Sequence, residues 1–305
     1  MIFLSLLLSS FFTFVELNCE NLFDTVHDSL KNDMEFLPDG SYHWTRTRYW
    51  KKVNHLSQEI IALGELNPRG DDLQSESLQN EQRAEQGMPI YNKGIDWRLP
   101  DMIALCEVEN DSAMIALTKR SLLRKVGYEY VMTSSPDERG IDVALMYQPM
   151  SFRLLNHHSI RVKRLPDMRP TRDILYAKGV LISDDTLHVF VVHAPSRRGG
   201  EEASRPYRLQ VASQLGQAVD SLYALNASAK ILIAGDFNDY HDSPALKQLE
   251  QHHLINISKS AKGRNGAKGT YRYHGEWNSL DQMLCSHSLY RQMKGCEIGD
   301  LPFLL

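Results

Sequence analysis

The stretch Ile231-Leu-Ile-Ala-Gly-Asp-Phe-Asn238 places a short apolar run directly before two polar residues. Such a run is typical of a buried strand that ends in a turn. Asp236 and Asn238 are two positions apart, so in an extended chain they lie on the same face. There a carboxylate can position a hydrated metal or an attacking water, while the amide hydrogen-bonds a phosphate oxygen. Aspartate and asparagine are also ordinary turn formers, which leaves a purely local role open.

A second apolar run, Asp101-Met-Ile-Ala-Leu-Cys-Glu107, delivers a glutamate at its end. Ends of buried strands are a common place for functional side chains. Glu107 is the leading candidate for a metal ligand, helped by Asn18 on an earlier strand, because magnesium needs few protein carboxylates. The alternative for Glu107 is an ion pair with a surface lysine.

A third run, residues 187–193, ends in His193 and is followed by Arg197 and Arg198. An imidazole beside two arginines suits a phosphate group. His193 can donate a proton to the leaving oxygen or stabilise the transition-state charge, and the arginines can clamp the non-bridging oxygens. A histidine at a strand end is more often a satisfied residue at the edge of the core.

A fourth segment, residues 269–286, is rich in aromatic residues and enters a strand that begins with Asp281. Asp281 is suited to orienting a histidine. The side chains of Tyr271, Tyr273 and Trp277 either stack on a nucleobase or cover the edge of a sheet.

Strands and helices are interspersed along the chain. Strands are expected at 12–17, 102–106, 143–147, 180–182, 187–192, 231–234 and 282–285, and helices at 49–63, 113–126 and 207–223. This pattern predicts layered sheets flanked by helices, in a single domain over residues 12–305. Residues 67–94 hold few apolar side chains and are interpreted as a polar surface insertion.

The composition limits the class of protein. With 305 residues, 42% apolar and 24% charged, the chain can bury one large core. Its net charge of −4 argues against tight, non-specific binding of long nucleic acids, so any nucleic-acid site would be a local basic strip. The cysteines show no zinc-binding spacing and are interpreted as buried thiols, with a disulfide left open: Cys19, Cys106, Cys285 and Cys296.

Residues 1–11 resemble the apolar centre of a secretory signal, but no positive charge precedes them and no cleavage site follows. We interpret them as the remnant of a signal peptide, which leaves export and a cytoplasmic location both open. The run is too short to span a membrane before Glu16, so stable membrane insertion is not expected. We expect a monomer.

The four segments, in this order, resemble the endonuclease/exonuclease/phosphatase superfamily, which includes deoxyribonuclease I. A bacterial branch is particularly similar in the motifs Asn18-Cys-Glu-Asn-Leu-Phe-Asp24, Arg139-Gly-Ile-Asp-Val-Ala144, His193-Ala-Pro-Ser-Arg-Arg-Gly-Gly200 and Gly235-Asp-Phe-Asn238. The resemblance implies a four-layer α/β sandwich, in which two mainly antiparallel sheets pack face to face with helices outside. It also implies a phosphoesterase that depends on Mg²⁺ or Mn²⁺.

The resemblance assigns roles to individual residues. The implied catalytic residues are His193, Asp236, Asn238, Asp281 and Asp142, and the implied metal ligands are Asn18 and Glu107. In this scheme Asp236 and Asn238 align water and phosphate. Asp142 supports His193, and Asp281 matches an aspartate that orients a histidine near the carboxyl terminus.

The chain departs from the family pattern after Asp281, where no Ser-Asp-His segment follows. In the family that segment precedes the last strand and supplies a second aspartate beside the metal and a catalytic histidine. We therefore expect one sheet to lack its last strand and Asp281 to lack a histidine partner. Loss of one member of a catalytic unit typically removes most of the rate enhancement.

Three functions are compatible with these features. The first is a metal-dependent phosphodiesterase that acts on nucleic acid, with an endonuclease-like nuclease favoured. The second is a truncated, inactive relative that binds phosphate-containing ligands through Arg197, Arg198, Arg205, Lys262 and Arg264. The third is an enzyme that acts on inositol phosphates or lipid headgroups, although no amphipathic helix rich in Lys, Arg and Trp favours it.

Overall fold

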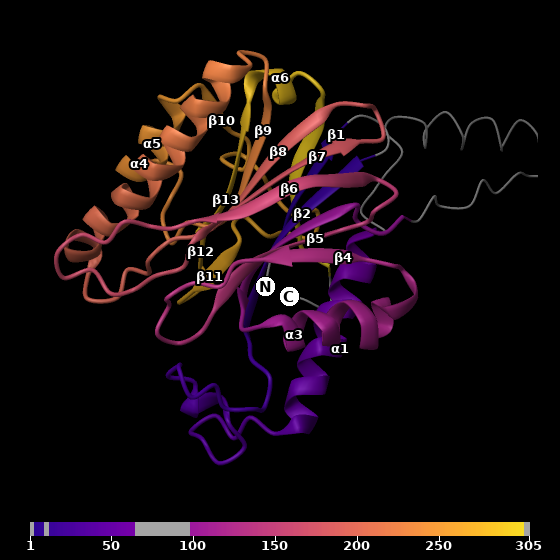
Figure 1. Ribbon diagram of the computed structural model, residues 1–305, viewed down its shortest axis with the longest axis vertical. Helices are drawn as coiled ribbons and strands as arrows, with labels where there is room; N and C mark the ends of the chain where they lie inside the picture. Colours follow the sequence, from indigo (N-terminus) through magenta and orange to yellow (C-terminus); the bar gives the residue numbers. More distant parts are fainter. Residues whose placement is uncertain (1–2, 9–11, 65–97, 302–305) are drawn as a thin grey trace, which may run out of the picture.

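The computed structural model describes residues 12–64 and 98–301, together with the backbone of residues 3–8. Within these residues, two six-stranded sheets pack face to face and helices cover the outer faces (Figure 1). In each sheet one pair of strands is parallel, β2 with β3 and β8 with β9, and the other pairs are antiparallel. The predicted α/β sandwich of two mainly antiparallel sheets is therefore confirmed.

The first sheet has the order β14 (Met293–Gly299), β1 (Phe3–Leu8), β2 (Phe12–Leu22), β3 (Met102–Val108), β5 (Asp142–Tyr147) and β4 (Glu129–Met132). The second has the order β10 (Leu254–Asn256), β13 (Asp281–Ser286), β9 (Lys230–Asp236), β8 (Thr186–His193), β7 (Ile174–Leu181) and β6 (Phe152–Ile160). A separate hairpin joins β11 (Tyr271–Tyr273) to β12 (Glu276–Asn278).

Helices lie on both sides of the sandwich, as Figure 1 shows. On the first sheet these are α1 (Arg46–Leu63), α3 (Asp111–Ile115), a π-helical turn η4 (Ala116–Arg120) and a 3₁₀ turn η5 (Leu122–Lys125). On the second sheet they are α4 (Glu201–Leu225) and α5 (Pro244–Glu250). Two short pieces are η2 (Met34–Phe36) and α6 (His287–Tyr290).

The core between the sheets fixes which strand residues can face each other. Phe14 of β2, Val191 of β8, Ala234 of β9 and Met283 of β13 all belong to this inner core. Side chains alternate between the faces of a strand, so residues at even separations from these lie on the same inner faces. The inner faces of the strands therefore continue into polar side chains at one end of the sandwich.

Several local expectations need correction. The single helix expected at 113–126 is divided at Ser121, whose hydroxyl donates to the Leu117 carbonyl and accepts from the Leu123 amide. Such a side chain offers the backbone an alternative to helical hydrogen bonds. The run at 180–182 is only the end of the longer strand β7. Strands β4, β6, β10 and β14 were not predicted.

The amino-terminal residues 3–8 form β1, which pairs with β2 on one side and β14 on the other. The interpretation of residues 1–11 as a signal remnant stays a prediction, as does the absence of a last strand. The predicted insertion at 67–94 lies outside the described residues. All four cysteines are free thiols; Cys19, Cys106 and Cys285 are buried as predicted, whereas Cys296 is only partly buried.

Candidate active site at the strand ends

Five predicted site residues lie where strands of both sheets end or begin. Asn18 and Glu107 lie near the ends of β2 and β3, whereas His193 and Asp236 end β8 and β9 and Asp281 begins β13. In the second sheet, Asp236 is the register partner of both His193 and Asp281. The structure therefore brings these five residues to the same end of the sandwich.

Asp236 is the centre of this arrangement. Its Oδ2 accepts a hydrogen bond from Asn18 Nδ2 at 3.1 Å, which links the two sheets. Its Oδ1 accepts from the Asn238 backbone amide at 2.7 Å, and His193 Nε2 lies 3.7 Å from Oδ2. The Asn238 side chain donates to the Ala194 carbonyl at 3.1 Å. Asp236 and Asn238 thus lie beside His193, but the Asn238 amide nitrogen is already engaged.

Glu107 approaches the same ring nitrogen of His193 as Asp236 does. Its Oε1 is 3.8 Å from His193 Nε2, and its Oε2 accepts the Asn21 backbone amide at 2.8 Å. Glu107, Asn21 and Asn238 all have positive φ, at 61°, 64° and 49°. Such left-handed conformations are costly for residues other than glycine and cluster at functional sites. The strand ends are therefore bent so that polar groups turn toward one another.

The electrostatics of this edge are unusual. Burial raises the pKa of Glu107. Burial raises the pKa of Asp236 well above its usual value, and repulsion from Asp281 raises it in addition. Burial also raises the pKa of Asp281 to about 6. The pKa of His193 lies well below its usual range, first because the ring is buried and then because Arg172 and Arg139 repel a second positive charge. Both effects favour the neutral form of the His193 imidazole, and its Nδ1 has no hydrogen-bond partner among the described residues.

Glu16 is a site residue that was not predicted. It lies on the inner face of β2, its side chain is completely buried, and neither carboxylate oxygen accepts a hydrogen bond from a described residue. Burial raises its pKa well above the usual value, followed by repulsion from Asp281 and Asp236. An acidic residue within the apolar run 12–17 was the available signal. Glu16 adds another carboxylate to the same edge.

Arg172 also contributes to the site without having been predicted. It is buried, its Nε donates to the His193 carbonyl at 3.2 Å, and its Nη2 donates to the Ala194 carbonyl at 2.7 Å. Its Nη1 donates to Asp137 Oδ2 at 3.2 Å. Arg172 therefore fixes the backbone at the end of β8.

Asp142 does not make the expected contact with His193. Its carboxylate accepts hydrogen bonds from the Thr133 hydroxyl and from the backbone amide and hydroxyl of Ser135. Among the described residues, no hydrogen bond joins Asp142 to His193. Asp142 instead anchors the loop between β4 and β5, and a supporting role for His193 stays a prediction.

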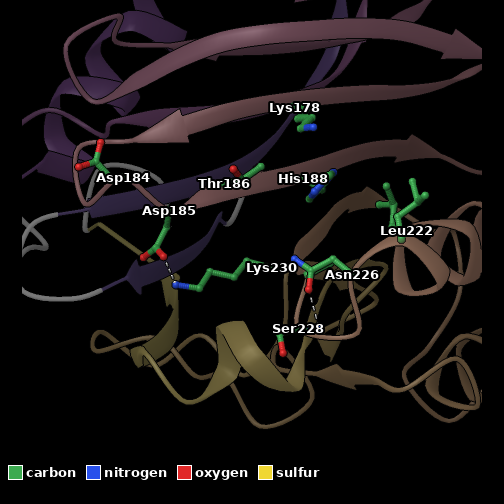
Figure 2. A pocket seen from close by; sticks show the side chains of 11 residues that line it. Lys178, Asp184, Asp185, Thr186, His188, Leu222, Asn226, Ser228 and Lys230 are labelled. Atoms are coloured by element: carbon green, nitrogen blue, oxygen red, sulfur yellow. Dashed lines mark hydrogen bonds and ion pairs between the residues drawn. The ribbon is translucent and has the colours of Figure 1, made fainter.

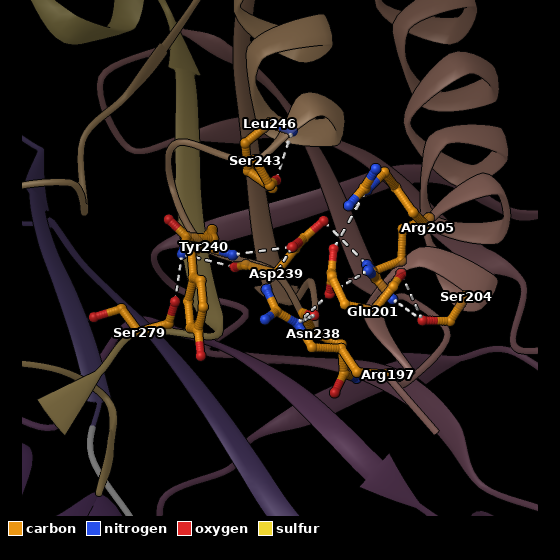
Figure 3. A network of polar contacts seen from close by, with 12 residues as sticks. Arg197, Glu201, Ser204, Arg205, Asn238, Asp239, Tyr240, Ser243, Leu246 and Ser279 are labelled. Carbon is orange, nitrogen blue, oxygen red and sulfur yellow. Dashed lines mark hydrogen bonds and ion pairs between the residues drawn. The ribbon is translucent and has the colours of Figure 1, made fainter. Parts of the chain in front are cut away.

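Two of the predicted phosphate-binding arginines, Arg197 and Arg205, lie in an ionic network beside the site, shown in Figure 3. Arg197 Nη2 donates to Asp239 Oδ1 at 2.6 Å, and its guanidinium stacks 4.0 Å from the Tyr240 ring. Arg205 lies 3.6 Å from Glu201 on the same helix. Arg208, which is 1% exposed, donates to Asp239 Oδ2 at 3.0 Å.

Several residues of the predicted basic surface already form ion pairs with acidic side chains. Arg264 pairs with Glu297 at 2.9 Å, so it too has an acidic partner. Arg198 is exposed in the loop that precedes α4. The phosphate-binding role of Arg197, Arg198 and Arg205 stays a prediction, and the contacts show that Arg197 also has a structural role.

The aromatic hairpin adjoins the strand that carries Asp281. The Asp281 backbone amide donates to the Thr270 hydroxyl at 3.4 Å, and Thr270 directly precedes β11. Tyr271 and Tyr273 are 42% and 58% exposed, with their rings stacked at 6.0 Å between centroids. The two tyrosines are therefore exposed, although their rings face each other and His274 contacts Tyr273.

The chemistry of the edge fits a hydrated divalent cation. Glu107 Oε1 and the Asp236 carboxylate are hard oxygen donors, which Mg²⁺ prefers. Asn18 presents its Nδ2 to Asp236, and its Oδ1 accepts the Glu20 backbone amide at 2.8 Å, so its predicted role as a metal ligand stays a prediction. Within residues 12–64 and 98–301, no three His, Cys, Asp or Glu side chains are gathered closely enough to enclose a metal ion. Mg²⁺ commonly binds one or two carboxylates and keeps several waters, so this sparse donor set suits it.

A cavity of about 350 Å³ lies at the opposite end of the second sheet, away from the candidate site (Figure 2). Lys178 and His188 line it from β7 and β8, and Lys230 pairs with Asp185 at 2.6 Å in its wall. His188 Nδ1 is hydrogen-bonded to the Tyr176 hydroxyl at 2.8 Å. The buried imidazole here is satisfied, in contrast to that of His193.

Comparisons with known proteins identify one matching family and several similar solved structures. The family described as "Endonuclease/Exonuclease/phosphatase family" matches residues 13–72 and 90–297. A search of curated proteins gives no match. Among solved structures, the human Nocturnin catalytic domain with bound sulfate shares 18% identity at a TM-score of 0.49, covering 72% of this chain and 76% of that one.

Two further solved structures are similar at low identity. Mannosyl-6-phosphatase Bt3783 of Bacteroides thetaiotaomicron shares 12%, with a TM-score of 0.49 and coverage of 70% and 77%. D. rerio TDP2, complexed with a single-strand DNA product, shares 14%, with a TM-score of 0.45 and coverage of 72% and 79%. In the described part of the chain, no helix is long and apolar enough to cross a membrane. The chain belongs to the endonuclease/exonuclease/phosphatase family, whose members are hydrolases that act on phosphoester bonds.

Proposed function

We propose that this protein is a divalent-metal-dependent phosphodiesterase and that its substrate is a nucleic acid. The observation that carries the proposal is the contact between the two sheets at Asp236. There, Asn18 from one sheet and His193 from the other approach the same carboxylate, and Glu107 approaches the same nitrogen of the imidazole. Oxygen ligands for a cation and a neutral imidazole thereby face one small region.

The residues at this edge have different roles in hydrolysis. Asp236 accepts the proton of the attacking water, because burial and Asp281 raise its proton affinity. Asn18 and the Asn238 amide hold the Asp236 carboxylate in place. Neutral His193 donates a hydrogen bond from Nε2 to a phosphate oxygen, where negative charge increases in the transition state. When bound beside Glu107, Mg²⁺ or Mn²⁺ supplies positive charge for the phosphate oxygens.

The exposed tyrosine pair favours nucleic acid as the substrate class. Tyr271 and Tyr273 are exposed on the hairpin next to Asp281. Aromatic side chains beside a phosphodiester site stack on bases of single strands without sequence preference. The chain's net charge of −4 agrees with recognition by a local surface rather than by overall attraction.

The experiment that tests this function is hydrolysis of plasmid DNA and of bis(p-nitrophenyl) phosphate by the purified chain in Mg²⁺. A chelator and the Asp236→Ala variant serve as controls. Turnover that needs the metal and disappears in the variant supports the proposal. Folded protein without turnover contradicts it.

A second candidate function is binding of phosphate-containing ligands without hydrolysis. The observation that favours it is the surroundings of Asp281. In the described part of the chain its side chain contacts Thr270 and is repelled by Glu107, and no histidine contacts it. Binding of a single-stranded oligonucleotide by wild type, without cleavage in Mg²⁺ or Mn²⁺, is the result that selects this candidate.

A further inference from the structure

The loop between β4 and β5, residues 133–141, brings Arg139 to the mouth of the candidate active site. Arg139 is exposed, and its Nη1 donates to Asn21 Oδ1 at 3.4 Å. The backbone amide of Asn21 donates in turn to Glu107 Oε2 at 2.8 Å. A single residue therefore separates the guanidinium from the proposed metal ligand.

Buried contacts hold this loop in position. Asp137 Oδ1 accepts the Arg139 backbone amide at 3.0 Å, and Asp137 Oδ2 accepts Arg172 Nη1 at 3.2 Å. Arg172 also holds the His193 carbonyl at 3.2 Å. From the other side, Lys31 Nζ donates to the Asp137 carbonyl at 3.0 Å. The backbone of Arg139 is thereby tied to the strand end that carries His193.

The guanidinium of Arg139 keeps donors available for a ligand. An arginine side chain has five N–H donors, and in the described structure Arg139 uses one of them, for Asn21. By contrast, the N–H donors of Arg172 are engaged by Asp137 and by backbone carbonyls, and those of Arg197 are engaged by Asp239 and Glu201. The positive charge of Arg139 lowers the pKa of both Glu107 and His193, so this charge lies near both side chains.

We propose that Arg139, oriented by Asn21, forms the anion subsite that binds the non-bridging oxygens of the scissile phosphate beside Glu107. The proposal rests on the proposed function, because it requires a phosphate to enter this edge. A planar guanidinium matches two phosphate oxygens at once. Because the loop is already ordered, binding a phosphate there requires little further loss of conformational freedom.

The first test compares the hydrolysis of bis(p-nitrophenyl) phosphate in Mg²⁺ by the full wild-type chain and three variants. Arg139→Ala raises KM by roughly 10- to 100-fold and changes kcat by no more than a few-fold, as expected for a lost charged hydrogen bond to bound phosphate. Arg139→Lys keeps the positive charge but loses the planar guanidinium that can donate to two phosphate oxygens, so it gives an intermediate KM.

The matched control is Arg169→Ala. Arg169 is exposed, and its Nη1 lies 3.9 Å from Glu138, the neighbour of Arg139 in the same loop. The control removes the same charge near the loop, so KM should stay within about twofold of wild type. Thermal unfolding of all variants checks that each one folds.

The second test measures inorganic phosphate binding to the Mg²⁺-loaded protein by ³¹P NMR titration, independently of turnover. Arg139→Ala weakens phosphate binding by the factor seen in KM, and Arg169→Ala leaves it unchanged. If wild type binds phosphate through Arg139 but does not hydrolyse the diester, the subsite stands and the proposed function fails. Equal binding by wild type and Arg139→Ala, or no phosphate binding by wild type, overturns the subsite.

Discussion

Asp236 and Asp239 are three residues apart after the same strand, and both are buried, yet their surroundings are opposite. Asp239 accepts hydrogen bonds from two arginines, Arg197 at 2.6 Å and Arg208 at 3.0 Å (Figure 3). Asp236 accepts from the neutral donors of Asn18 and Asn238. Within the described residues no lysine or arginine pairs with it.

The difference separates a structural ionic network from a candidate active site. Around Asp239 each buried charge has an opposite charge, so the network holds the loop against α4. Around Asp236 lie the carboxylates of Glu16, Glu107 and Asp281, and no lysine or arginine of the described residues forms an ion pair with any of the three. Burying like charges together is unfavourable, and such clusters mark functional sites because a cation or substrate relieves them.

The largest expected effect is on catalysis at Asp236. Asp236→Asn should lower kcat/KM for bis(p-nitrophenyl) phosphate by about 10³-fold or more, because the amide cannot accept a proton. The free energy of unfolding should not fall, because the change removes a charge that burial disfavours. Initial rates and urea unfolding measure the two quantities. If the variant lost much of its stability as well as its activity, Asp236 would have a structural role like that of Asp239, and the contrast between the two residues would be wrong.

The converse change is Asp239→Asn, which leaves the buried Arg208 guanidinium with Glu201 as its remaining acidic partner. Removing one partner of a buried ion pair typically costs about 3–5 kcal/mol. Urea unfolding measures the loss, and Glu201→Gln, at a half-exposed position, serves as the milder control. The folded variant should keep kcat within a few-fold of wild type. A stability equal to wild type would show that the network is not structural.

Stability of the metal-free protein should depend on pH through the carboxylates near Asp236. The pKa of Asp281 rises from 3.8 to about 6 in the folded protein, so the folded state retains a proton that the unfolded state releases. Stability should therefore fall by about 2–3 kcal/mol as the pH rises from about 4 to about 6.

This pH dependence is measured by urea unfolding in a chelator across that interval. Asp281→Asn should flatten the dependence, because the amide does not titrate. At neutral pH, above the pKa of about 6 of Asp281, added Mg²⁺ should recover part of the loss. An unchanged pH dependence in Asp281→Asn would mean that the like-charge cluster is not responsible.

The smallest effect is expected at Arg205. Its guanidinium lies 3.6 Å from Glu201 one helical turn away, at a partly exposed position. Such pairs contribute about 0.3–0.5 kcal/mol, so Arg205→Ala should change both stability and KM little. Steady-state kinetics decide the point. A tenfold rise in KM would establish the phosphate-binding role predicted from the sequence and would extend the active site into the ionic network.

The sequence predicts the parts of the site that follow from single strands. Glu107, His193 and Asp236 each follow an apolar run, and the end of a buried strand is recognisable from local pattern alone. The layered architecture follows in the same way, because the long strands and α1 and α4 have strong periodicity. These features depend on neighbours in the chain, which a single sequence shows directly.

The features that were missed depend on partners distant in the chain. Glu16 becomes part of the site because β2 faces β9 and β13 across the inner core, and Arg172 because its side chain reaches the end of β8. Asp142 was expected near His193, but the loop residues Thr133 and Ser135 take its oxygens. The exposed edge strand β6 lacks the apolar pattern that identified the buried strands.

The most direct test of the central claim is the calorimetric titration of metal-free protein with Mg²⁺ at neutral pH, comparing wild type with Glu107→Gln and Glu201→Gln. The account predicts a binding event in wild type that is lost or strongly weakened in Glu107→Gln and retained in Glu201→Gln, since Glu201 already has arginine partners. Identical titrations for wild type and Glu107→Gln, or no binding by wild type, would contradict a cation site among the carboxylates near Asp236.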